Sequence, residues 1–439
     1  MTSFLHPPAW QSLSRGAVTT FGFRILGASL LYGLHVLLAR WASTDGYGAY
    51  VFAISWASVL AQLGALGLPS AALRFVPEYR TSQRPELLRG FLQTGRGLLL
   101  VGTGGLALAA IGVALVVPTG SIHLPALLTG LALTPLMGLL LFEKEVLRAC
   151  NRFAWAYAPD QILRPLVVGG GVGGIVWTTG TVSPVQVLLC TGGTFVLLIP
   201  LQQWGARATL TEAYEWSAER RPRRWLRVAI PLLLTGGFQL VLNKTDIFVV
   251  GALVGTEEVG IYFAALRTAQ AITFLSFAVD AVAGPEVARL YHGDSEDLQR
   301  TVSGLAHWYF WPTLAAALGL LLVAKPVLSL FGPAFTAGRP MMAVLMVGFL
   351  VNAATGAQTH LLTLTGHERS CAYIYGWCAA LNIGLNLAGV YAYGALGAAL
   401  ATATTLTVRN LWVRHRVVHL TGLRPSIVAA LGPASPSHA

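Results

Sequence analysis

Residues 243–270 read NKTDIFVVGALVGTEEVGIYFAALRTAQ, an apolar stretch that is interrupted by Lys244, Asp246 and Arg267. Apolar runs of about 20 residues predict helices that cross a lipid bilayer. A charged side chain at the centre of a bilayer costs about 2.5–3.5 kcal/mol even on insertion scales measured with the translocon. Charges in such runs therefore indicate either a functional site or a specific ion pair.

The composition indicates an integral membrane protein. Of its 439 residues, 55% are hydrophobic and 11% are charged, and the mean hydropathy is +0.64. This is too little charge to cover a soluble protein of that length. The net charge is +11, and the basic residues that produce it lie between apolar runs. Lys and Arg in such loops orient membrane helices, so we expect no nucleic-acid binding.

Three further features of the sequence argue against a disulfide framework, a zinc site and a removable signal peptide. The four cysteines have no CxxC spacing and lie in or beside apolar runs, so we expect them to pack rather than to form a disulfide framework. The stretch GHERS at 366–370 lacks the second histidine of a zinc-protease motif, so no metal site is expected. The opening residues lack the pattern of a removable signal peptide, and the first helix is expected to direct insertion.

A sliding window of about 20 residues predicts an all-α integral membrane protein with twelve spanning helices. The predicted spans are residues 17–41, 47–69, 90–117, 124–142, 159–179, 183–204, 227–254, 259–282, 303–324, 340–364, 371–391 and 394–413. Cytoplasmic loops collect Lys and Arg. The predicted outer connections hold Arg40, Lys325 and Arg339, whereas the inner ones hold clusters such as residues 220–227, which predicts that both termini are cytoplasmic.

The longest inner connection divides the chain into two halves. It comprises residues 206–226 and separates a predicted six-helix lobe at 1–205 from a second one at 227–413, which is followed by a cytoplasmic tail at 414–439. Because six is an even number, the two lobes share one orientation, and we expect a pseudo-symmetry axis along the membrane normal. This architecture is typical of alternating access around a central cavity.

A weak internal repeat supports the division into lobes. When the chain is compared with itself at one constant offset and without gaps, the segment after the first predicted span matches the segment after the seventh. The matched pairs include Thr44 with Thr256, Gly48 with Gly260, and Tyr50 with Tyr262.

Two stretches carry a resemblance to a known family: TDIFVVGALVGTEEVGIYFAALRTAQ at 245–270 and HLLTLTGHERSCAYIYGWCAALNIGLNLAGVYAYGALGAALATATT at 360–405. They resemble the polysaccharide-exporter branch, which includes lipid-linked oligosaccharide and O-antigen flippases, of the multidrug/oligosaccharidyl-lipid/polysaccharide exporter superfamily. That superfamily also contains the multidrug and toxin extruders and the lipid II flippases.

The resemblance implies a flippase of the bacterial cytoplasmic membrane. Such a protein moves an undecaprenyl-pyrophosphate-linked oligosaccharide from the inner to the outer leaflet for cell-surface polysaccharide synthesis, and it is neither an enzyme nor dependent on a cofactor. The partners that it implies are the pyrophosphate head group of the lipid-linked oligosaccharide, membrane lipids, a coupling ion (H⁺ or Na⁺) and other polysaccharide assembly proteins.

The depth of the buried charges indicates a substrate site. At 1.5 Å per residue, Lys244, Asp246 and Arg267 lie about 12–15 Å below the outer surface, and Arg24 lies about 10 Å from the inner surface. We expect Asp246 to reach Arg267 on the next helix. Our hypothesis is that the three basic residues neutralise the pyrophosphate, because Arg offers it paired donors, while Asp246 orients them or titrates with the coupling ion.

Other polar residues of the spans leave two interpretations open. His35 is either a buried partner or a titrating group. Asn382 and Asn386 are four residues apart on one helical face, where they line a sugar path or bridge helices. Arg96 and Arg164 lie close enough to the inner surface to extend their charges into water. For the deep charges, the alternative to cargo binding is an ion pair that joins the lobes.

Two rival functions fit the sequence less well. A cationic-drug exporter of the same superfamily needs acids in its cavity, but the first span offers Arg24 and His35 and no acid. A membrane glycan polymerase needs catalytic groups on a sizeable outer loop, and the predicted outer loops hold no paired carboxylates.

Overall fold

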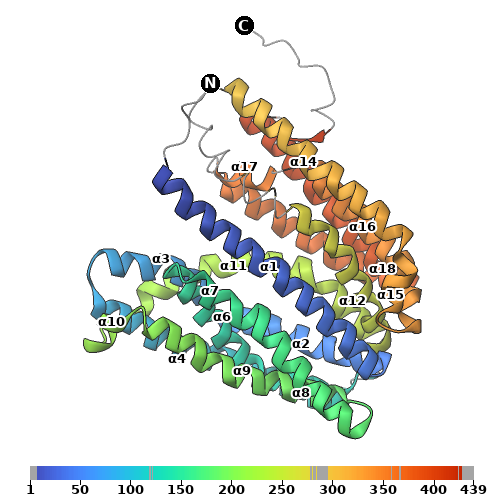
Figure 1. Cartoon of the computed structure of the whole chain (residues 1–439), viewed down its shortest axis with the longest axis horizontal. Coiled ribbons are helices and arrows are strands. Elements are labelled where there is room, and N and C mark those ends of the chain that lie inside the picture. Colours follow the sequence, from blue (N-terminus) through green and yellow to red (C-terminus); the bar gives the residue numbers. More distant parts are fainter. Residues whose placement is uncertain are drawn as a thin grey trace. The chain divides into compact units, whose positions relative to one another are not determined.

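The computed structural model is built from helices throughout the part of the chain that it describes (Figure 1). The described residues are 7–117, 120, 122–276, 279, 283, 295–356, 358–364, 367–423 and 425–427, and no strand occurs among them. The side chains of residues 7–21 and of Arg24 lie outside this description. The all-α fold class is therefore confirmed.

Contacts divide the chain into two compact units between Leu240 and Val241. We call residues 1–240 the N-terminal unit and residues 241–439 the C-terminal unit. The division falls inside helix α11 (Pro222–Leu253). The lobe boundaries at 205 and 227 stay a prediction.

The described part of the N-terminal unit contains eleven complete helical elements and the first part of α11. They are α1 (Pro7–Trp41), α2 (Thr44–Gly64), α3 (Leu68–Thr81), α4 (Pro85–Val116), α5 (Leu124–Ala132), α6 (Thr134–Ala149), α7 (Phe153–Ala158), the π-helical turn η1 (Pro159–Leu163), α8 (Arg164–Thr179) and α9 (Pro184–Arg207), with the short α10 (Thr211–Glu215) before α11.

The C-terminal unit contains the second part of α11 and the elements that follow it. The described ones are α12 (Thr256–Gln270), η2 (Ala271–Thr273), α14 (Ser295–Leu322), α15 (Ala324–Ser329), η3 (Pro333–Gly338), α16 (Arg339–Ala354), α17 (Gln358–Leu364) and α18 (Glu368–Thr421).

Helix α18 consists of two arms that turn back on each other. The chain breaks at Gly394, whose φ of 58° and ψ of −143° suit glycine but few other residues. The backbones of the two arms then meet at Gly389 and Gly397. A Cβ atom added at Gly397 would lie 1.8 Å from the carbonyl oxygen of Gly389, so only glycine allows this approach. The predicted spans at 371–391 and 394–413 lie on the two arms.

The lengths and the surface of the helices are those of a membrane protein. Among the described residues, eight helices are long and apolar enough to cross a membrane, or up to ten if each of two bent pairs is one span. Large apolar side chains face outward, among them Trp177, Leu322 and Val116 at 91%, 86% and 82% exposure. The number of twelve spans and the cytoplasmic placement of both termini stay predictions.

The segment predicted as a linker is packed against the N-terminal unit. Figure 1 shows α10 beside α4. Arg89 of α4 donates from Nη1 to the carbonyl oxygen of Tyr214 at 2.8 Å. At the start of α11, Trp225 is fully buried and donates from Nε1 to the hydroxyl of Tyr79 at 2.9 Å. These bonds fix the entry of α11 to the unit that precedes it.

Trp225→Ala is expected to lower the free energy of unfolding by about 3–5 kcal/mol, because it leaves a large cavity in a close-packed core. Trp216→Ala is the matched control, since Trp216 lies in the same segment with 56% of its surface exposed. The measurement is the melting temperature of the detergent-solubilised chain. Equal melting temperatures for the two variants would contradict a structural role for the buried indole.

Candidate functional site

The centre of the candidate site in the C-terminal unit is Asp246 of α11, which is 2% exposed. The hydroxyl of Tyr262, on α12, donates to Asp246 Oδ2 at 2.6 Å. The backbone N–H of Ile247 donates to Oδ1 at 2.8 Å. A buried carboxylate needs such donors, because each oxygen that leaves water loses its hydrogen bonds. Two neutral donors thus hold Asp246 between two helices.

Two basic side chains share this neighbourhood. Lys244 lies within electrostatic range of both Asp246 and Arg267. Arg267 donates from Nη1 to Gln270 Oε1 at 3.2 Å, and its guanidinium lies 4.8 Å from the ring centre of Phe263. The structure therefore brings the three predicted charges together within one unit, and it adds Tyr262 as a partner of Asp246 that the sequence did not indicate.

Asn382 and Asn386 lie in the first arm of α18 and are buried. Asn382 donates from Nδ2 to Thr405 Oγ1 on the second arm at 3.3 Å, and Asn386 donates to the backbone carbonyl of Asn382 at 2.9 Å. Within the described part of the chain, neither Oδ1 atom has a hydrogen-bond partner. The pair therefore joins the two arms through its donors and leaves two buried acceptors.

A small cavity lies between Asn382 and α11. Its volume is about 10 Å³, and its lining includes Asn243, Asn382, Thr402 and Thr405. Thr402 also lies next to the hydroxyl of Tyr262. Side chains from α11, α12 and both arms of α18 thus form one polar cluster, which we call the Asp246 cluster: Asp246, Tyr262, Asn382, Asn386, Thr402 and Thr405.

The two remaining predicted residues belong to the N-terminal unit. His35 of α1 is buried, and its Nδ1 atom lies 3.3 Å from the hydroxyl of Tyr47 on α2. The two rings meet edge to face with centres 6.0 Å apart. Arg24 also lies on α1, but its side chain is outside the described residues.

The sequence interpretation missed a buried ion pair in the N-terminal unit. Arg96 of α4 donates to both carboxylate oxygens of Glu143 on α6, at 2.6 and 3.0 Å. Gln203 of α9 donates to the same carboxylate at 3.2 Å, and Glu143 is fully buried. Arg96 was expected to reach the membrane surface. Because Glu143 lies one residue beyond a predicted span, its position was a signal for a partner at similar depth.

Arg164 has a partner in the same unit. Its Nη1 atom lies 3.2 Å from Asp160 Oδ1, one turn earlier in the chain. Asp160 is on the π-helical turn η1 and also lies within electrostatic range of Lys144 on α6. The expected extension of Arg164 into water is thus replaced by an ion pair inside the unit.

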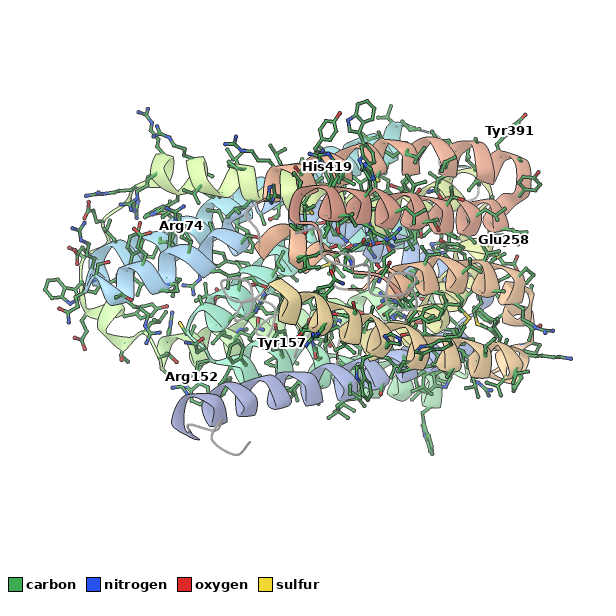
Figure 2. All side chains as sticks on the ribbon, turned by 90° about the horizontal axis from the view of Figure 1, so that it is seen from above. Arg74, Arg152, Tyr157, Glu258, Tyr391 and His419 are labelled. Carbon is green, nitrogen blue, oxygen red and sulfur yellow. The ribbon has the colours of Figure 1, made fainter. Side chains whose placement is uncertain are left out.

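Figure 2 labels charged and aromatic residues of both units. It shows Arg74 and Arg152 toward the same end of the N-terminal unit. The same view shows Glu258 and Tyr391 toward one end of the C-terminal unit. Arg74 lies in α3, Glu258 in α12 and Tyr391 in α18, whereas Arg152 directly precedes α7.

Solved structures of two kinds of membrane transporter are similar to this chain. An inward-facing multidrug resistance transporter of the MATE family, in the MOP superfamily, matches with a TM-score of 0.71 at 14% identity, over 90% of this chain and 96% of that one. The lipid II flippase MurJ in an inward closed conformation matches with a TM-score of 0.70 at 17% identity, over 92% and 87%. At these identities the similarity shows the fold.

A curated relative matches over a shorter region. The riboflavin transporter of Rhizobium johnstonii is 38% identical over 132 residues, which are 28% of this chain. The chain spans 41% of the length of that relative.

A family model decides the assignment. The model described as polysaccharide biosynthesis protein matches residues 13–290, which is more than half of the chain. This match identifies the chain as a member of the polysaccharide biosynthesis protein family, and the similarity to the two transporter structures shows that it shares their fold.

Proposed function

We propose that the chain is a flippase that moves an undecaprenyl-pyrophosphate-linked oligosaccharide from the inner to the outer leaflet of the bacterial cytoplasmic membrane by alternating access. The observation that carries the proposal is the excess of basic charge around Asp246. Lys244 lies within electrostatic range of both Arg267 and Asp246, and Asp246 already receives hydrogen bonds from Tyr262 and Ile247. Because the chain belongs to the polysaccharide biosynthesis protein family, the pyrophosphate of a lipid-linked glycan is the anion that we assign to this basic site.

The chemistry of a pyrophosphate suits such a site. Its oxygens accept several hydrogen bonds, and bonds between charged partners are about twice as strong as neutral ones. A basic site inside a membrane also lowers the cost of moving the anion through hydrocarbon, where an unpaired charge is expensive. Arg24 stays a predicted third basic residue of the pyrophosphate site, because the sequence places it within the first span.

We propose further that the Asp246 cluster binds the coupling ion, H⁺ or Na⁺. Two features support this role: a buried carboxylate and the unpartnered Oδ1 atoms of Asn382 and Asn386. Hard monovalent and divalent cations prefer oxygen ligands. A proton or a sodium ion at Asp246 would change the net charge beside Lys244 and Arg267, and this gives a physical link between ion and cargo.

A second candidate is transport of a small aromatic solute. The 132-residue match to a riboflavin transporter favours it. The two functions differ in the charge of the cargo and in its lipid anchor. Transport of free riboflavin by the purified chain, with no movement of any pyrophosphate-linked glycan, would replace the flippase proposal. Export of a cationic dye in the same assay would instead support a drug exporter.

Lys244→Gln and Arg267→Gln are each expected to slow flipping about 10- to 100-fold, because a hydrogen bond to a charged partner contributes about 1.5–3 kcal/mol. The measurement is the arrival of a fluorescent lipid-linked oligosaccharide in the outer leaflet of proteoliposomes, detected with a quencher that does not cross the bilayer. Arg24→Gln tests the third basic residue in the same way.

The matched control for these variants is Lys325→Gln, which removes an exposed cation from the same unit. It is expected to flip at the rate of the unchanged protein. If Lys244→Gln and Arg267→Gln also keep that rate at equal protein level, these residues do not bind the cargo.

Asp246→Asn is expected to abolish the response of flipping to an imposed Na⁺ or H⁺ gradient, because the amide carries no charge for the ion to neutralise. Tyr262→Phe keeps the carboxylate and removes its 2.6 Å donor, so it should weaken the response without abolishing it. The measurement is the ratio of flipping rates with and without the gradient. Glu257→Gln, which changes an exposed carboxylate, is the control; a normal gradient response in Asp246→Asn would place the coupling ion elsewhere.

A further inference from the structure

The N-terminal unit contains a second polar cavity, away from the residues that the sequence singled out. Its volume is about 160 Å³. Polar side chains from five helical elements line it: Ser58 and Gln62 of α2, Lys144 of α6, Asp160 of η1, Arg164 of α8, and Gln202 of α9. All of them belong to one unit, so the cavity is complete within residues 1–240.

Gln202 is the side chain that most directly indicates a bound ligand. It is fully buried, and within the described part of the chain neither its Oε1 nor its Nε2 atom has a hydrogen-bond partner. A buried amide without partners costs about 1–3 kcal/mol in proteins. Because Gln202 lines the cavity, a polar group bound there would satisfy it.

The charges in the cavity decide the sign of that group. Lys144 and Arg164 contribute two positive charges against one negative charge from Asp160. Asp160 is engaged by both cations, with Arg164 Nη1 at 3.2 Å and Lys144 within electrostatic range. The net charge of +1 disfavours a metal cation. It favours an anion, to which Lys144, Arg164 and two neutral amides present donors.

The size of the cavity narrows the choice of anion. Pockets for drug-sized molecules measure about 300–1,000 Å³, so this cavity is too small for a sugar chain. A phosphate group is small enough and offers several acceptor oxygens. Asp160 is also carried on a π-helical turn, a rare element that occurs frequently at functional sites.

We propose that this cavity binds a phosphate group of an anionic ligand, with Lys144 and Arg164 as the cationic donors, Gln202 donating from Nε2, and Asp160 orienting Arg164. Two sources share this chemistry, the pyrophosphate of the cargo and the head group of an anionic phospholipid. The assignment to the cargo rests on the proposed function, whereas the binding of an oxyanion at this place does not.

The test is binding of inorganic pyrophosphate to the full-length chain in nanodiscs of neutral phosphatidylcholine. Millimolar pyrophosphate is expected to bind saturably and to raise the melting temperature. Lys144→Gln and Gln202→Leu are each expected to weaken binding about tenfold or more. Lys325→Gln, an exposed cation of the other unit, should leave binding unchanged. Gln202→Leu removes a buried polar group, so its own stability should not fall.

Three results separate the outcomes. Loss of binding in Lys144→Gln and Gln202→Leu, but not in Lys325→Gln, supports the site even if the chain flips no glycan lipid, so the site and the proposed function fail separately. No pyrophosphate binding to the unchanged protein, together with saturable binding of phosphatidylglycerol that Lys144→Gln removes, assigns the site to a lipid head group and overturns its link to the cargo. Equal binding of either anion by all three variants overturns the site itself.

Discussion

The pairing of buried carboxylates is the constraint on which the helix arrangement of each unit depends. Hydrocarbon offers no hydrogen bonds, so a charged group between apolar helices must find its partners within the protein. Glu143 takes them from Arg96 and Gln203 and so links α6 with α4 and α9. Asp246 takes them from Tyr262 and its own backbone and links α11 with α12. Each carboxylate therefore fixes which helices are neighbours as well as satisfying its own charge.

The two units share a register but differ in where they carry charge. Thr44 and Thr256 are the first residues of α2 and α12, so the offset found in the sequence also matches equivalent positions in two helices. The charged residues of the C-terminal unit have neutral counterparts at that offset: Tyr32 for Lys244, Leu34 for Asp246 and Ser55 for Arg267. The N-terminal unit carries its paired charges on α4 and α6, and on η1 and α8, instead. A repeat that keeps its helices and changes its charges can place its polar sites on different helices in its two halves.

The helices could be predicted from the sequence because apolar runs report directly on burial in lipid. The run at 90–117 became α4, and the break between 391 and 394 became the turn at Gly394. The partners of the charges could not be predicted in the same way. Arg96 and Glu143 lie far apart in the sequence, and their pairing follows from the packing of α4 against α6, which hydropathy does not encode. The short distance from the membrane surface suggested that Arg96 extends into water. Pairing with the nearby carboxylate is more favourable, because it does not require the side chain to pass apolar neighbours.

Helix α11 is the covalent connection between the two units. A conformational change that is transmitted along the backbone from one unit to the other passes through this helix. Its first turn is fixed in the N-terminal unit by Trp225 and Tyr79, and its later part is fixed in the C-terminal unit by Asp246 and Tyr262. Between these two fixed points lies Pro231, which removes a backbone donor from the helix. The proposed alternating access needs a change of conformation that leaves both anchors intact. The stretch between Trp225 and Asp246 meets that need, because a helix bends at proline at lower cost than it breaks a buried hydrogen bond to a carboxylate.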